Sequence, residues 1–84
     1  MEVKQIKKHI DIKDIVSKYI YLSRIGKDRY RGYCPFHNEK RPSFTVYSDT
    51  QSYYCFGCGA GSDVISFLMK INRIDFKTAL KHLS

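Results

Sequence analysis

The feature that most constrains the fold of this 84-residue chain is a pair of short segments that each hold two metal-binding side chains. Cys34-x-x-His37 comes first, and Cys55-x-x-Cys58 follows after a stretch long enough for a β-hairpin. Two tight turns that face each other can close a tetrahedron of ligands around one ion. Three thiolates and one imidazole favour Zn²⁺, with an iron site as the weaker alternative. We therefore predict one structural zinc ion bound by Cys34, His37, Cys55 and Cys58.

The small size of the chain explains why such a site is needed. A core built from 84 residues is marginal and usually depends on disulfides, a metal or a partner. Three cysteines cannot all pair within the chain, and no signal peptide points to an oxidising compartment. No stretch approaches the roughly 18 apolar residues of a membrane span. The sequence thus predicts a soluble, cytoplasmic chain that is held together by zinc and has no membrane partner.

Two other chemistries fit parts of the cysteine pattern. The second cysteine pair alone could be a redox dithiol, but no βαβ pattern surrounds it. His37-x-Glu39 with a later Cys-x-x-Cys is similar to the signature of zinc deaminases, in which the glutamate transfers protons. However, Tyr54 replaces the proline expected before the cysteine pair, and Cys34 fills the position that a catalytic water would need. Both remain weaker alternatives to a structural site without catalytic residues.

Apolar periodicity predicts helices at both ends of the chain and a sheet between them. Helical spacing in residues 1–19 indicates two short helices, the second capped by Asp11. Tyr-rich segments broken by Gly and Pro indicate short antiparallel strands within 20–58, and Gly57 and Gly59 suit a turn with positive φ. Residues 62–83 predict two further helices, capped by Ser62 or Asp63 and by Asp75. We expect one domain over residues 1–84, a small α+β zinc ribbon whose antiparallel sheet is flanked by N-terminal and C-terminal helices.

The basic residues are concentrated near the predicted zinc site. The chain carries a formal net charge of +7, and the segment from Arg24 to Arg41 holds six basic and two acidic residues. The strand period places cations and aromatic rings together on one face, opposite Tyr30, Phe44 and Val46. Such a face suits single-stranded nucleic acid, although charged side chains also simply keep a small sheet in solution. The predicted nucleic-acid contacts are Arg29, Arg31, Tyr33, Lys40, Arg41 and Tyr47, with Thr45 on the same face.

Two long segments of the chain resemble a known family. CPFHNEKRPSFTV at 34–46, YCFGCGAGSDVISFLM at 54–69 and the preceding KDRYRGY closely resemble the N-terminal zinc-binding domain of bacterial replicative DNA primases. The resemblance covers nearly the whole chain and implies the same Cys-His-Cys-Cys zinc ligands. It implies that the sheet helps bind the single-stranded DNA template, with Arg31 and Lys40 at positions equivalent to basic contacts. It also implies that primer synthesis belongs to a separate catalytic domain.

The resemblance leaves the context of the domain open. A primase catalytic domain carries a cluster of acidic metal ligands, whereas the six aspartates of this chain are scattered over caps and turns. We therefore expect no nucleotidyl transfer by this chain alone. It would be either a fragment of a longer primase or a free-standing subunit that acts in trans, in bacterial or mobile-element replication machinery. The expected partners are the template, a primase catalytic domain or subunit, and a replicative helicase. The alternative function is a zinc-ribbon interaction module that docks a helicase or polymerase.

Overall fold

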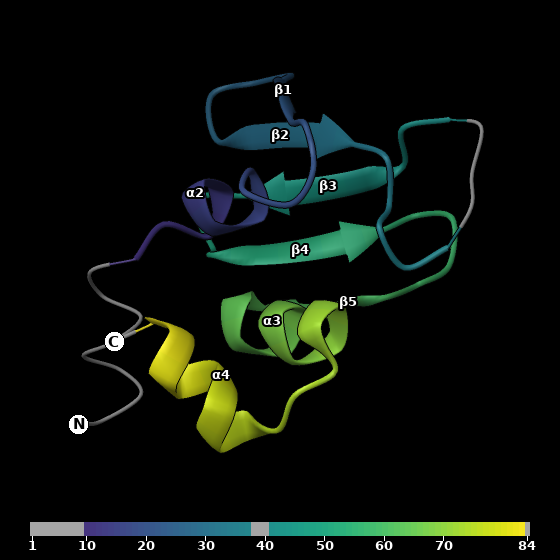
Figure 1. Ribbon diagram of the computed structural model, residues 1–84. Helices are drawn as coiled ribbons and strands as arrows, with labels where there is room; N and C mark the ends of the chain where they lie inside the picture. Colours follow the sequence, from purple (N-terminus) through teal and green to yellow (C-terminus); the bar gives the residue numbers. More distant parts are fainter. Residues whose placement is uncertain (1–9, 38–40, 84) are drawn as a thin grey trace.

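The computed structural model describes residues 10–37 and 41–83, which form a five-stranded sheet and three helices (Figure 1). The first of the two predicted N-terminal helices lies outside the described residues. No helix within the described ranges is long and apolar enough to cross a membrane. In chain order the elements are α2 (Ile12–Val16), β1 (Ser23–Arg24), β2 (Arg29–Gly32), β3 (Phe44–Tyr47), β4 (Ser52–Cys55), β5 (Gly61–Asp63), α3 (Val64–Asn72) and α4 (Phe76–Leu83).

The sheet is an antiparallel meander in which each strand pairs with the next along the chain, in the order β1-β2-β3-β4-β5. Helices α2 and α3 contribute to the core on one face of the sheet, and α4 packs on α3. This arrangement confirms the predicted α+β fold with helices at both ends. The sheet extends beyond the predicted range 20–58, because β5 pairs with β4 and the C-terminal helices begin only at Val64.

The core joins the middle of the sheet to the helices. Phe44 and Tyr53 lie on the adjacent strands β3 and β4, and their rings stack with the centroids 5.2 Å apart. Phe67 of α3 meets both rings at 5.6–6.0 Å, and Phe36 from the first zinc-binding turn approaches Phe67 at 5.6 Å. Offset and edge-to-face aromatic pairs stabilise a core by more than the burial of their surface alone. The zinc-binding turn is therefore packed directly against the centre of the domain.

Short polar side chains begin each of the helices as the sequence predicts. Asp11 accepts a hydrogen bond from the backbone N–H of Lys13 at 3.0 Å, at the start of α2. Asp63, rather than Ser62, caps α3 by accepting from the N–H of Ser66 at 2.9 Å. Asp75 does the same for α4, with Thr78 N–H as the donor at 2.8 Å. Each carboxylate satisfies a backbone donor that has no partner within the helix.

The turn between β3 and β4 is tied to the start of α2 by Gln51. Its Oε1 accepts a hydrogen bond from the Ile12 N–H at 2.8 Å, and its Nε2 donates to the Ser48 carbonyl at 2.7 Å and to Asp11 Oδ1 at 3.3 Å. Gln51 has a φ of 53°, which costs a non-glycine residue free energy. The three hydrogen bonds of its side chain offset that cost and fix α2 against the edge of the turn.

Candidate metal centre

The four predicted metal ligands come together in the structure. The ligand atoms of Cys34, His37, Cys55 and Cys58 all lie within 4.8 Å of one another. The Sγ atoms of Cys34 and Cys58 are 3.9 Å apart. A tetrahedral zinc ion with Zn–S bonds of about 2.3 Å places its sulfur ligands about 3.8 Å from each other. The donor set and its spacing therefore fit one Zn²⁺ ion, and the four residues are positioned to bind it.

Two turns at the same end of the sheet position these ligands. Cys34 follows β2, and Cys55 is the last residue of β4. The turn after β4 is closed by hydrogen bonds from the Cys55 N–H to the Ala60 carbonyl at 2.7 Å and from the Gly59 N–H to the Cys55 carbonyl at 2.8 Å. Gly59 has a φ of 80°, as predicted, whereas Gly57 has no positive φ. The expected requirement for left-handed backbone thus holds at Gly59 alone, because a single left-handed residue is enough to reverse the chain here.

The surroundings shift the pKa values of the two buried cysteines in opposite directions. Burial raises the pKa of the Cys34 thiol to about 12, although the Phe36 N–H points at its Sγ from 3.4 Å. Burial also opposes ionisation of Cys55, but hydrogen bonds from the Ser43 hydroxyl and from the backbone of Cys58 and Gly57 bring its pKa below the ordinary value. The Ser43 Oγ and Cys55 Sγ are 3.6 Å apart. Backbone and hydroxyl donors around a thiolate hold the ligand in place and tune it.

A metal at this position is enclosed by the protein on most sides. Cys34 and Cys55 are buried, His37 is half-buried and Cys58 is exposed at the surface. A tetrahedral ion with four protein ligands has no open position for water or substrate. When bound, zinc would therefore supply a cross-link between the two turns and no Lewis-acid chemistry.

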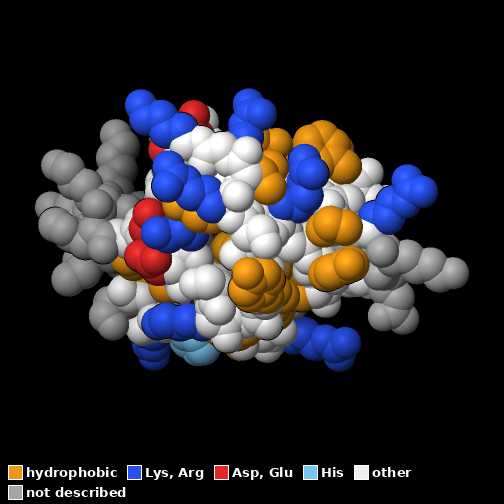
Figure 2. Space-filling view, turned by 90° about the horizontal axis from the view of Figure 1, so that it is seen from above, with side chains coloured by type: hydrophobic (Ala, Val, Ile, Leu, Met, Phe, Trp, Pro, Cys, Tyr) orange, Lys and Arg blue, Asp and Glu red, His pale blue; other side chains and the backbone are white. Residues whose placement is uncertain are grey.

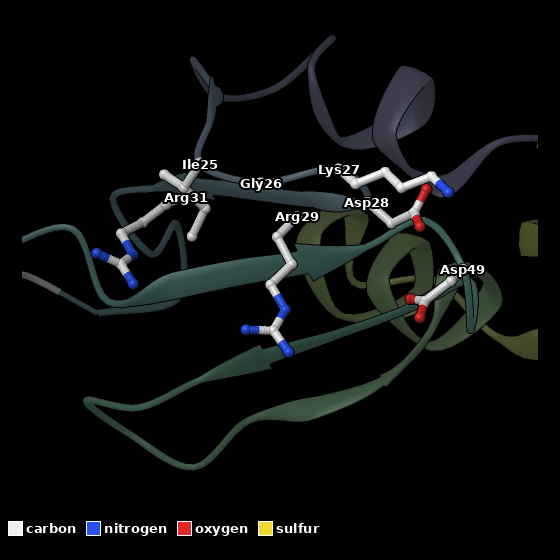
Figure 3. Close-up of a pocket in the computed structure, with 7 residues that line it drawn as sticks. All are labelled: Ile25, Gly26, Lys27, Asp28, Arg29, Arg31 and Asp49. Atoms are coloured by element: carbon white, nitrogen blue, oxygen red, sulfur yellow. The ribbon is translucent and has the colours of Figure 1, made fainter.

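Three of the residues predicted to contact nucleic acid, Arg29, Arg31 and Tyr47, lie on strands β2 and β3 and on the face of the sheet opposite the helices, here called the outer face. Strand register aligns Arg29 with Tyr47, and Arg31 with Thr45 and then Tyr54. Both arginines are exposed, and the Arg29 guanidinium carbon lies 5.6 Å from the centre of the Tyr47 ring. In Figure 3 the two arginine side chains lie in front of the sheet, while helices lie behind it.

Thr45 is less exposed than expected for a residue of this face, and two exposed tyrosines were not among the predicted contacts. Thr45 is only 3% exposed, because Arg31 and Tyr54 on the neighbouring strands flank its short side chain. Tyr54 is 41% exposed beside Thr45, and the alternation of Tyr53 and Tyr54 in β4 is the signal that could have found it. Tyr21, which precedes β1, is 83% exposed, and no periodicity in the sequence marks it.

The remaining predicted contacts are Tyr33, Lys40 and Arg41. Tyr33 is 56% exposed just after β2. Arg41 is exposed on the segment that leads into β3. Lys40 lies outside the described residues. The structure thus gathers Arg29, Arg31, Tyr33 and Tyr47 along β2 and β3, with Arg41 close to them in sequence.

Known protein families and individual proteins resemble this chain in sequence. The profile of the CHC2 zinc finger family matches residues 1–84. The chain is 45% identical over 82 residues to the DNA primase of Thermotoga maritima and 46% identical over 82 residues to that of Lactococcus lactis. Each alignment covers 98% of this chain but only 14% and 13% of the respective relative. This chain therefore spans about one seventh of the length of these primases.

A solved structure shows the same fold. The crystal structure of the zinc binding and RNA polymerase domains of the Aquifex aeolicus primase superposes on this chain with a TM-score of 0.91 and 38% sequence identity. The superposition covers 99% of this chain and 21% of the Aquifex chain. Fold, ligand geometry and sequence agree, and we conclude that this chain belongs to the CHC2 zinc finger family, the zinc-binding domain of bacterial DNA primases.

Proposed function

We propose that the domain binds single-stranded template DNA on the outer face of its sheet and so supports initiation of RNA primers by a primase catalytic domain. The observation that carries this proposal is the strand register, which sets Arg29 and Arg31 in the same cross-strand rows as Tyr47 and Tyr54. Arginine pairs with phosphate, and exposed aromatic rings stack on bases that are not paired. A face that offers both kinds of side chain suits a single strand.

The charge of the domain supports the same ligand. Binding of one Zn²⁺ by three thiolates lowers the formal charge of +7 by one, so the zinc-loaded domain stays strongly basic. The hollow drawn in Figure 3 is lined by three cations, Lys27, Arg29 and Arg31, and by two carboxylates, Asp28 and Asp49, so positive charge is in excess there. A cluster of cations raises the local concentration of a polyanion and speeds its association. Electrostatic attraction would therefore guide a strand toward the outer face.

We further propose that residues 1–84 act as one module in which zinc is structural, and that nucleotidyl transfer occurs in another domain or subunit. The full-length primases of Thermotoga maritima and Lactococcus lactis are about seven times longer than the matched region. Their remaining length leaves room for a separate catalytic part. The proposed setting is the cytoplasm, where the template, the catalytic part and a replicative helicase meet.

A second function, docking of an acidic protein surface, is favoured by one observation away from the outer face. A hollow of about 280 Å³ lies between the first zinc-binding turn and α3, lined by Pro35, Phe36, Lys70, Ile71 and Arg73. The Lys70 Nζ sits 5.0 Å from the centre of the Phe36 ring. Apolar walls with two cations suit an acidic segment of a helicase or polymerase.

A titration with labelled single-stranded DNA tests the proposed function. The zinc-loaded double variant Arg29→Ala/Arg31→Ala should bind the oligonucleotide less tightly than the wild-type chain, since two cations that pair with phosphates are removed. Lys77→Ala/Lys81→Ala on α4 changes the net charge equally and serves as the matched control. Equal weakening by both pairs would show that only overall charge matters. Undetectable binding by the zinc-loaded wild type would favour protein docking instead.

A further inference from the structure

An apolar hollow lies at the edge of the outer face, next to the arginines described above. Its volume is about 350 Å³, and it lies where the segment before β1 crosses the end of β2. We call it the tyrosine hollow. Its lining includes Ile20, Tyr21, Arg31, Gly32, Tyr33 and Pro42. Figure 2, which views the molecule from the β1 side, shows hydrophobic side chains lying among Lys and Arg side chains on this surface.

Gly32 creates the shape of the tyrosine hollow. A Cβ added at Gly32 would come within 2.5 Å of the Tyr21 carbonyl oxygen and 3.4 Å of the Ile20 Cδ1. The absence of a side chain therefore lets the segment around Tyr21 pass directly over the end of β2. Tyr21 and Tyr33, which line the hollow, are exposed at 83% and 56%. Large aromatic rings exposed together around an apolar hollow are typical of a binding site.

Arg31 connects the tyrosine hollow to the cationic part of the outer face. Arg31 lines both this hollow and the neighbouring one that contains Lys27 and Arg29. Asp28 and Asp49 also line that neighbouring hollow, at the end away from Arg31 (Figure 3). The two carboxylates repel a phosphate backbone, so a bound strand is directed away from them and toward the tyrosines.

We infer that the tyrosine hollow receives one unpaired nucleobase of the bound single strand, stacked on Tyr21 or Tyr33, while Arg31 holds the adjoining phosphate. The positive charge of Arg31 favours a nucleotide over an apolar peptide as the occupant. An apolar peptide would fill the hollow but leave the guanidinium at its rim without an anion. A nucleotide joins a stackable base to an anionic phosphate through one sugar, and so it satisfies both features together. This inference rests on the proposed function, because it names the part of the DNA that one region of the outer face binds.

A comparison of two oligonucleotides with the same backbone charge, one with bases and one without, provides the test. Two probes would be titrated into the zinc-loaded chain of 84 residues: an oligothymidylate about eight nucleotides long and an abasic oligonucleotide of the same length. Of the variants Tyr21→Ala and Tyr33→Ala, the one that removes the stacking ring should weaken binding of the oligothymidylate by between about 5-fold and 150-fold. Neither variant should change binding of the abasic probe. Tyr21→Phe should bind like the wild type, since it keeps the ring.

Phe76→Ala is the matched control, because it removes a ring that is 47% exposed on α4, away from the sheet. It should leave binding of both probes unchanged. If the wild type binds oligothymidylate but neither tyrosine variant weakens that binding, the tyrosine hollow is not a base site and the proposed function stands. Equal weakening of both probes by a tyrosine variant would also overturn the base assignment. If the wild type binds neither probe, the proposed function fails together with this inference.

Discussion

Removal of zinc from this domain should unfold it. Folded domains are stabilised by roughly 0.05–0.15 kcal/mol per residue, which corresponds to about 4–13 kcal/mol for a chain of 84 residues. Structural zinc sites contribute apparent binding free energies of about 10–16 kcal/mol at pH 7. The contribution of the metal is therefore as large as the expected stability of the whole domain.

The structure shows why the effect would not stay local. Cys55 is the cross-strand partner of Phe44, and Phe36, which follows Cys34 by two residues, packs against Phe67 in the core. Without the ion, nothing would cross-link the two turns that bring Cys34, His37, Cys55 and Cys58 together. The turns and the aromatic core should come apart in one step.

Circular dichroism during titration with a strong chelator measures this effect. We expect the helical signal and the thermal transition to disappear together and to return when Zn²⁺, but not Mg²⁺, is added back. Because thiols must lose their protons to bind zinc, the metal should also be released more readily as the pH falls below about 7. A metal-free chain that keeps a cooperative thermal transition would refute the reasoning.

Substitutions at three positions test the energetics of the fold, each by urea unfolding of the zinc-loaded chain. Arg73 ends α3 with a φ of 53°, so Arg73→Gly should stabilise the domain by about 0.5–1 kcal/mol, whereas Arg73→Ala should give no gain. Asp63→Ala should cost about 1 kcal/mol because it removes the α3 cap, and Asp63→Asn should restore most of it; equal destabilisation by both would contradict the capping role. The Thr45 hydroxyl is buried with no hydrogen-bond partner among the described residues, so Thr45→Val should stabilise by about 1 kcal/mol while Thr45→Ser should not.

Local signals explain what could be predicted from the sequence. The metal ligands were recognisable because tight turns require a fixed spacing of two residues between paired ligands. The caps at Asp11 and Asp75, and a cap at Ser62 or Asp63, were recognisable because a capping side chain binds the backbone two or three residues ahead. These features depend on neighbours in the sequence, and the structure confirms them.

The missed features depend on contacts between distant residues. Strand β5 contains Gly61 and has no alternating apolar pattern, and it exists because its backbone pairs with β4. The hydrogen bond from the Ile12 N–H to Gln51 spans 39 residues. The tyrosine hollow likewise forms only because Gly32 admits a segment from before β1. No periodicity within one segment could have indicated these features.

The salt dependence of single-stranded DNA binding tests the central claim most directly. If the outer face of the zinc-loaded domain neutralises about four phosphates, the logarithm of the binding constant should fall with the logarithm of salt concentration with a slope near −3. Replacing Arg29 and Arg31 by alanine should reduce the magnitude of that slope by about 1.4, since each phosphate that is no longer neutralised accounts for about 0.7. A slope near zero for the wild type, or an unchanged slope in the double variant, would contradict the account.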